Sequence, residues 1–266
     1  MKSLKQFISN KFVLFALGIV FVLALWFLLS LLLDRNNVVF PSPIVTFGEL
    51  FKLLGQGKTY RYLGYTFLRI LMGFSLSMLS ALVLGLFAGN HPNLYQFLKP
   101  LMIVIKSIPT VALVFVFIVV AQPKYAPILL VFVVCFPIIY EGVVGGIRNV
   151  DKDVLDSSKV DGATYFKGAF YIKFPLAVPF ILVSMISSFA LSFKIEIMAE
   201  VITGVTARGL GSAISSARTN DPTNTAIIFA YALLAVLIVL LVSLIEELVK
   251  YLAKRRQEGK ATLIEN

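Results

Sequence analysis

The segment LLGQGKT, at residues 53–59, resembles the end of a phosphate-binding loop, because a glycine, a lysine and a threonine follow one another at its end. In a phosphate-binding loop, the backbone amides of a glycine-rich turn surround the phosphates and the lysine contacts them. That pattern needs a second glycine five residues before Gly57, and this position holds Lys52. We therefore predict that the chain does not bind ATP itself.

Residues that could serve a metal site or covalent catalysis are few. His91 is the only histidine and Cys135 the only cysteine. Neither a cysteine nor a cluster of carboxylates stands near His91, so we interpret it as a solvated loop residue rather than a ligand. Cys135 lies in an apolar run, and no nucleophile with a matching base is visible. We predict no catalytic residue, no metal site and no cofactor.

Charged side chains within apolar stretches are stronger candidates, because such groups are costly in hydrocarbon and usually face a protein interior or a cavity. Arg69 and Lys106 lie near the ends of apolar stretches, where a structural position is favoured over contact with a solute. Glu141 ends another stretch and is expected at the membrane interface. Lys194 and Glu196 are two residues apart, so they point to different faces of a helix.

Hydroxyl groups add to the candidates for a solute path. Ser184, Ser187 and Ser188 share one helix face through their spacing of three and four residues. Serines on such a face either allow close helix packing or line a polar path, and the sequence leaves both open. The candidate path residues are Arg69, Pro109, Thr110, Ser184, Ser188, Lys194, Glu196 and Glu200.

The elements that position these side chains are predicted to be membrane-spanning helices. The chain has 266 residues, of which 59% are hydrophobic and 14% are charged. Soluble domains carry about 25% charged residues, and a soluble core could not hide this much apolar surface, so the bilayer is the expected solvent. We assign most of the net charge of +10 to Lys and Arg beside the membrane rather than to nucleic-acid binding.

Apolar stretches of about 20 residues predict six spans in an all-α membrane protein. The third and fourth spans are separated only by AQPKYAP, which predicts a tight hairpin. We expect a single domain over residues 1–266, with its core at 60–250, a cytoplasmic loop at 148–175 and a cytoplasmic tail at 251–266. The predicted spans are 12–33, 70–89, 101–123, 125–140, 174–193 and 226–245.

The distribution of Lys and Arg predicts the orientation. With the N-terminus inside, the inner segments hold about twice as many Lys and Arg as the outer ones, which favours cytoplasmic ends for the chain. The first apolar run, at 12–33, is longer than the core of a signal peptide and ends without a small-residue cleavage site, so we expect a retained first helix.

The segment DSSKVDGATYFKGAFYIKFPLAVP, at residues 156–179, interrupts the apolar pattern with mixed charge. It predicts an amphipathic surface helix whose apolar members include Tyr165, Phe166 and Phe170. Exposed aromatic side chains mark interfaces, but a loop that lies on its own bundle fits the pattern equally well. Pro175 suits the first turn of the following membrane helix, because proline lacks an amide hydrogen.

This segment resembles the EAA loop in the permease subunits of bacterial ABC importers. The family pattern is Glu-Ala-Ala, three residues, Gly, nine residues, Ile, one residue, Leu, Pro. The chain follows this spacing, with Asp for Glu, two serines for the two alanines and Phe for Leu. The matching residues are Asp156, Ser157, Ser158, Gly162, Ile172, Phe174 and Pro175.

Four further segments carry the same resemblance in the same order. They are FPSPIVTFGELFKLL at 40–54, TFLRILMGF at 66–74, LKPLMIVIKSIPTVAL at 98–113 and MAEVITGVTARGLGSAI at 198–214. The most similar branch is that of nitrate, sulfonate and taurine permeases, which also includes importers of thiamine precursors. The chain departs from that branch at FIVVAQPKYAP, where the branch has an aromatic-rich Leu-Trp-Phe-Gly-x-Gly stretch.

The resemblance implies a permease that works as a dimer, with a second copy of the chain as the expected partner. It also implies two separate ATPase subunits, which bind the ATP, and an extracytoplasmic solute-binding protein. The expected location is the bacterial inner membrane. The alternative is a small secondary transporter driven by an ion gradient, which would need mid-membrane acids or broken half-helices in a repeat.

In the family, the EAA loop forms a coupling helix that docks in a groove of the ATPase subunit. The resemblance assigns contact with the ATPase to Gly162, Ala163, Tyr165, Phe166 and Phe170, and the junction with the fifth span to Ile172, Phe174 and Pro175.

Overall fold

The structure, a computed structural model, describes residues 11–33, 39–150, 173–204 and 208–264. In these ranges the chain is helical apart from short connections, which confirms the predicted all-α fold. The helices are α2 (Lys11–Leu33), α3 (Pro43–Leu54), α4 (Gly57–Asn90), α5 (Pro92–Ser107), α6 (Thr110–Ala121), α7 (Ala126–Arg148), α10 (Phe174–Thr203), α11 (Leu210–Asn220) and α12 (Thr225–Ile264).

Five of these helices, α2, α4, α7, α10 and α12, are long and apolar enough to cross a membrane. A sixth crossing is possible if α5 and α6 count as one span. Several helices run beyond the predicted apolar stretches. Helix α4 begins at Gly57 instead of residue 70, and α12 continues to Ile264 through the predicted tail. A helix needs only its hydrocarbon-facing part to be apolar, so a search for continuous apolar runs finds the middle of each helix and misses its ends.

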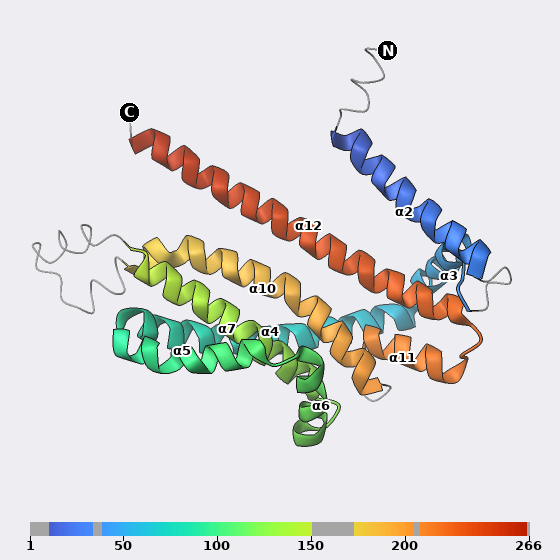
Figure 1. Cartoon of the computed structure of the whole chain (residues 1–266), viewed down its shortest axis with the longest axis horizontal. Helices are drawn as coiled ribbons and strands as arrows, with labels where there is room; N and C mark the ends of the chain where they lie inside the picture. The colour runs from blue at the N-terminus through green and yellow to red at the C-terminus, as the bar shows by residue number, and fades with distance from the viewer. Residues whose placement is uncertain (1–10, 34–38, 151–172, 205–207, 265–266) are drawn as a thin grey trace, which may run out of the picture.

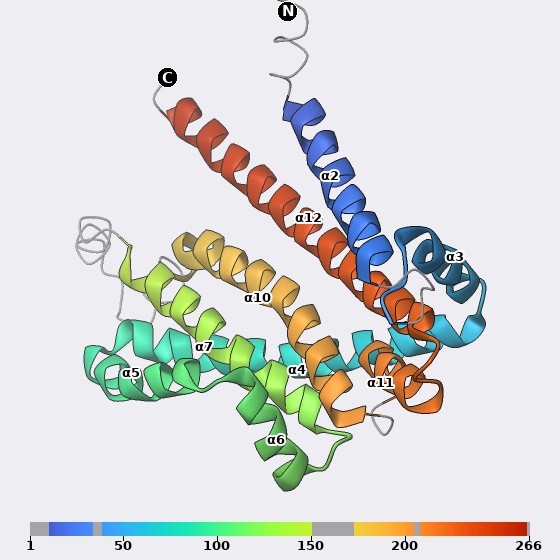
Figure 2. The same cartoon turned by 45° about the vertical axis from the view of Figure 1, so that its right-hand side comes forward.

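The predicted third span, 101–123, is not a straight helix. Helix α5 ends at Ser107, α6 begins at Thr110, and the two are bent by 96°. Pro109 has no amide hydrogen to donate to the preceding turn, and it favours an extended backbone at Ile108, whose φ and ψ are −74° and 127°. Helix α6 therefore projects away from the bundle (Figures 1 and 2).

The predicted hairpin between the third and fourth spans is present. Gln122 has a φ of 68°, which turns the chain at the end of α6. The amides of Tyr125 and Ala126 then donate to the Gln122 carbonyl at 3.1 Å, and α7 starts at Ala126.

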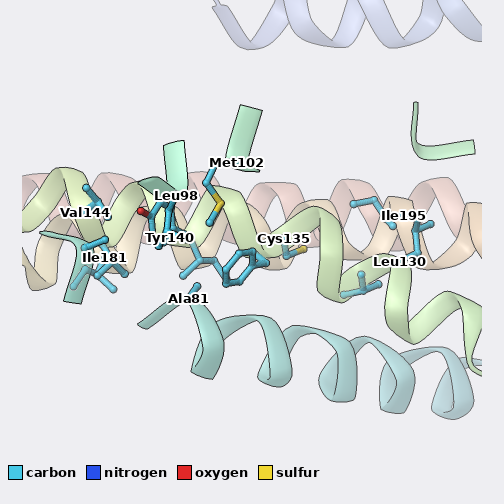
Figure 3. Close-up of a cluster of buried hydrophobic side chains, with 14 of the residues drawn as sticks. Ala81, Leu98, Met102, Leu130, Cys135, Tyr140, Val144, Ile181 and Ile195 are labelled. Carbon is cyan, nitrogen blue, oxygen red and sulfur yellow. The ribbon is translucent and has the colours of Figure 1, made fainter. Parts of the chain in front are cut away.

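The main core lies between α4, α7 and α10. Helix α7 is the most buried of the three, and its Leu130, Ile139 and Tyr140 are almost fully enclosed. Gly73 and Gly85 of α4 allow the close approach of α7, because a Cβ at either glycine would overlap α7 atoms. Figure 3 shows part of this cluster, with side chains of α4, α5, α7 and α10 meeting around Tyr140.

A second cluster joins α3, α11 and α12 at the opposite end of the bundle from the α4–α5 turn (Figure 1). Leu50 and Leu53 of α3 meet Leu210 of α11 and Tyr231 of α12 there. Helix α2 stands apart from the α4, α7 and α10 core (Figure 2). It is held near α3 by hydrogen bonds from its side chains to the carbonyls of residues 40 and 41, at 3.0 and 3.1 Å.

Candidate functional site

A buried carboxylate joins three helices. Glu200 of α10 is fully buried, and its Oε1 lies 2.7 Å from a guanidinium nitrogen of Arg69 on α4. The Thr66 hydroxyl lies 2.8 and 3.0 Å from the two Glu200 oxygens. The Gly211 amide donates to Oε2 at 2.9 Å, and the Leu210 amide donates to the Thr66 hydroxyl at 2.8 Å. A charge buried at this depth needs such partners, and these partners connect α4, α10 and the start of α11.

The segment Gly209-Leu210-Gly211 is shaped by this carboxylate. A Cβ at Gly209 would overlap the carboxylate of Glu200, and a Cβ at Gly211 would overlap the Ile197 carbonyl. Both positions therefore require glycine for space, and Leu210 fills the second core cluster between them. The two path candidates Arg69 and Glu200 thus form a packed ion pair.

Glu196 lies one helical turn before Glu200 and is also fully buried. Among the described residues, neither of its carboxyl oxygens has a hydrogen-bond partner. Lys194, by contrast, is exposed. The prediction that Lys194 and Glu196 occupy different faces of the helix is therefore confirmed.

The serines of α10 pack against neighbouring turns and against α7. Ser184 donates to the Ile181 carbonyl at 2.8 Å, and Ser188 donates to the Ser184 carbonyl at 2.7 Å. A Cβ at Gly142 of α7 would overlap Ser184. Cys135 of α7 reaches the Ser188 carbonyl at 3.4 Å. Of the two interpretations that the sequence left open, these contacts favour close helix packing.

An ion pair lies beside the bend between α5 and α6. Lys106, in the last turn of α5, donates to both carboxyl oxygens of Glu141 on α7 at 2.8 Å. The two side chains are 46% and 49% exposed. The path candidates Pro109 and Thr110 follow directly, with Pro109 exposed and Thr110 half-buried. The sequence placed Lys106 and Glu141 at the ends of separate stretches, and no spacing rule linked residues 35 positions apart.

A hollow of about 600 Å³ opens beside residues 65–72 of α4, between the α6–α7 turn and the start of α11. Its described lining holds three cationic residues and no acidic one. Lys124 lies over the ring of Tyr125, with its Nζ 5.1 Å from the ring centroid. The lining residues are Tyr65, Leu68, Arg69, Met72, Lys124, Tyr125, Ile128 and Arg208.

The predicted ATPase-coupling residues from Asp156 to Ile172 lie outside the described residues. Phe174 and Pro175 open α10, where Pro175 occupies the first turn, as predicted. Phe174 packs against the main core cluster, and Lys173 donates to the Asn90 side chain at the end of α4 at 3.0 Å. Figure 1 shows the start of α10 beside the end of α7 and the α4–α5 turn.

The segment that looked like a phosphate loop is a turn between α3 and α4. The Thr59 hydroxyl donates to the Leu53 carbonyl at 2.7 Å and is buried, so this hydroxyl stabilises the turn. His91 lies in the turn between α4 and α5, exposed to solvent, with its Nδ1 2.9 Å from the Phe87 carbonyl.

A bundle of helices that are long and apolar enough to cross a membrane, with charged groups between them, is the architecture of an integral membrane protein. Residues 81–258 match the family described as "Binding-protein-dependent transport system inner membrane component". The match covers more than half of the chain, which therefore belongs to this family. The chain is a transmembrane permease of the ABC importer class. The alternative that the sequence left open, a small secondary transporter driven by an ion gradient, is therefore not supported.

Two curated relatives lie in the predicted branch. The nitrate import permease protein of Synechocystis is 26% identical over 188 residues, which cover 66% of this chain and 67% of the relative. The putative aliphatic sulfonates transport permease protein of Bacillus subtilis is 24% identical over 165 residues, which cover 62% of this chain and 60% of the relative. The predicted resemblance to nitrate and sulfonate permeases is therefore confirmed.

Solved structures of the MetNI methionine ABC transporter in inward-facing conformations share the fold. Two crystal forms each align with a TM-score of 0.57, at 19% and 18% identity. The alignments cover 76% and 73% of this chain and 96% and 94% of the solved chains. At this level of identity the likeness concerns the fold alone.

Proposed function

We propose that two copies of this permease form a solute path through the bacterial inner membrane. Separate ATPase subunits bind the ATP and drive the path, and an extracytoplasmic binding protein delivers the solute. The observation that carries this proposal is the family match over 81–258, which includes the predicted coupling loop and the helices on both sides of it.

The ATPase is proposed to dock on the end of the bundle where the coupling loop begins and ends. Arg148 closes α7 and Phe174 opens α10 at this end, and the α4–α5 turn lies beside them (Figure 1). With both termini in the cytoplasm, this end faces the cytoplasm. The hollow lined by Lys124 and Arg208 then faces the opposite side, where a binding protein would release its solute.

The proposed solute is a small anion of the nitrate or sulfonate type. Arg69 is already paired with Glu200, so Lys124 and Arg208 supply the hollow with positive charge that no acidic residue of its described lining offsets. Cationic side chains bind the oxygens of such anions through charge-assisted hydrogen bonds. The names of the two relatives, a nitrate and an aliphatic sulfonate permease, agree with this chemistry, which favours an anion over the thiamine-precursor type.

The test is reconstitution of the permease in lipid vesicles with an ATPase subunit and a solute-binding protein from the same organism. Uptake of labelled nitrate, alkyl sulfonates and uncharged controls is measured with and without ATP. We expect anion uptake that requires ATP and all three components, and no ATP hydrolysis by the permease alone. Uptake driven by an ion gradient, with no ATPase present, would contradict the proposal.

A further inference from the structure

The pair formed by Lys106 and Glu141 is unusual in its exposure. Arg69 and Glu200, another ion pair between helices of the described part of the chain, are enclosed by protein. Lys106 and Glu141 are instead each about half exposed, on the surface where α5 meets α7. The exposed side chains of α2 and of residues 226–245 of α12 are apolar, for example Val20 and Leu240.

The pair also lies at the depth of the hydrocarbon. Glu141 follows Ala126, the first residue of α7, by fifteen positions and precedes Arg148, the last, by seven. At about 1.5 Å per residue, it lies about 22 Å from one end of the helix and about 10 Å from the other. Since the hydrocarbon core of a bilayer is about 30 Å thick, a span of this length places Glu141 inside it, and not at the membrane interface where the sequence pattern predicted it.

The backbone beside the pair is irregular. The helix stops at Ser107, Ile108 is extended, and α6 leaves at an angle of 96°. Non-helical backbone at membrane depth occurs where it is buried in protein or lines a water-filled cavity, because lipid offers no hydrogen bonds. Ser107, Ile108 and Pro109 are exposed in the single chain. The charged pair and the broken helix therefore both indicate that this face does not lie against lipid.

We propose that Lys106 and Glu141 line the water-filled solute path in its cytoplasmic half, and that their ion pair holds the bend between α5 and α6 against α7. This inference rests on the proposed function, since it assigns a place in the solute path. Lys106 offers its ammonium group to a passing anion there. Because Glu141 offsets most of that charge, the half-exposed pair attracts the anion only weakly and does not hold it, as transport requires.

The direct test measures water access at Ser107 in the assembled transporter in lipid vesicles. Ser107→Cys is made in a Cys135→Ser background and reacted with a charged thiosulfonate reagent that does not dissolve in lipid. Leu240→Cys on α12 is the matched control, because Leu240 is 54% exposed and lies mid-span on a lipid-facing helix. We expect the cysteine at 107 to react at least about tenfold faster, by the contrast between water and hydrocarbon. Equal rates at the two positions would overturn the proposal.

The charges are tested by exchange. Glu141→Gln and Lys106→Met should each lower ATP-driven uptake by about fivefold, as expected when one partner of a partly exposed pair is removed. The exchanged pair, Lys106→Glu with Glu141→Lys, should again hold the bend between α5 and α6 against α7 and so restore the labelling rate at 107. It should not restore anion uptake, because the positions of the two charges are reversed. Full uptake by either single variant, or by the exchanged pair, would contradict a role in the path.

A structural role alone would not make labelling sensitive to solute. Saturating nitrate or sulfonate, delivered with the binding protein, should slow the reaction at 107 and leave the control at 240 unchanged. If the assembled transporter moves no anion but the cysteine at 107 still reacts rapidly, the choice of solute is wrong and the water-lined face stands. If transport is normal and the cysteine at 107 is unreactive, the proposal for Lys106 and Glu141 fails by itself.

Discussion

Arg69 and Glu200 are 131 residues apart in the sequence, and their charged groups lie 2.7 Å apart in the structure. The pair fixes α4 to α10 beside the start of α11. Hydrogen bonds from Thr66 and Gly211 complete the coordination of the carboxylate. The cationic hollow includes Arg69 in its lining, so the geometry of the hollow depends on this buried pair.

Loss of Arg69 should destabilise the fold strongly. Arg69→Met leaves Glu200 buried without its cation, and breaking a buried pair costs about 3–5 kcal/mol. The measurement is the thermal unfolding midpoint of the purified permease in detergent. Lys52→Met is the matched control, because Lys52 pairs with Glu49 at 2.7 Å on the surface and its loss should cost less than about 1 kcal/mol. Equal decreases in the unfolding midpoint for the two variants would show that the buried pair stabilises the fold no more than the surface pair does.

Gly209→Ala should also destabilise the permease, by steric overlap rather than by the loss of a charge. The added Cβ overlaps the Glu200 carboxylate, so the carboxylate or the start of α11 must move. Such overpacking costs about 1–3 kcal/mol. Gly48→Ala is the control, since a Cβ at Gly48 of α3 meets nothing within 4 Å and alanine favours a helix. An unchanged midpoint for Gly209→Ala, measured beside a stabilised Gly48→Ala, would argue against tight packing at Glu200.

The turn between α11 and α12 should show a pH dependence in acid. The Thr223 hydroxyl donates to Asp221 at 2.6 Å and the Asn224 amide at 3.2 Å, and these bonds hold the pKa of Asp221 below its usual value. A lowered pKa means that the stabilising contribution is present above the usual aspartate pKa and is lost as the pH falls through the folded value. Thr223→Val should raise the pKa of Asp221, which NMR titration of the carboxyl carbon can measure. An unshifted titration would contradict the turn geometry.

The sequence predicted the spans well because hydrocarbon imposes a length and a polarity that can be counted along the chain. It did not predict α11, because Leu210–Asn220 is a short helix of mixed polarity at the edge of the bundle. The break at Pro109 was also missed, since the run on either side is apolar and only the angle between α5 and α6 reveals it.

The sequence did not predict which charged residues contact each other, for a different reason. The Arg69–Glu200 and Lys106–Glu141 pairs depend on how α4 is rotated and shifted against α10 and how α5 is placed against α7, which the spacing along the chain does not give. The sequence named all four charged residues as notable. It could not show that one pair would be enclosed by protein and the other half exposed.

The orientation in the membrane can be tested by cysteine labelling of intact cells. Gln56→Cys and Thr219→Cys lie in exposed positions at the end of the bundle that we expect outside, and Asn93→Cys is exposed at the α4–α5 turn that we expect inside. An impermeant reagent should label the first two and spare the third until the cells are opened. Native Cys135 is fully buried and should remain unlabelled in the wild type, which controls for background. The reverse pattern would invert the orientation.

The coupling assignment is tested at Gly162, which lies outside the described residues, so its basis is the family spacing and the adjoining aromatic residues Tyr165 and Phe166. If an ATPase groove approaches the backbone there, any side chain adds volume at a packed contact, at about 1–3 kcal/mol, and a charged one adds desolvation. Gly162→Asp should therefore abolish co-purification of the ATPase and uptake, while the thermal midpoint of the permease stays unchanged.

Gly168→Asp makes the same change in the same segment but outside the family spacing, and it should retain the ATPase. Full ATPase recovery and normal uptake with Gly162→Asp would overturn the assignment. Equal loss with Gly168→Asp would mean that added charge, rather than the packed contact at Gly162, prevents docking.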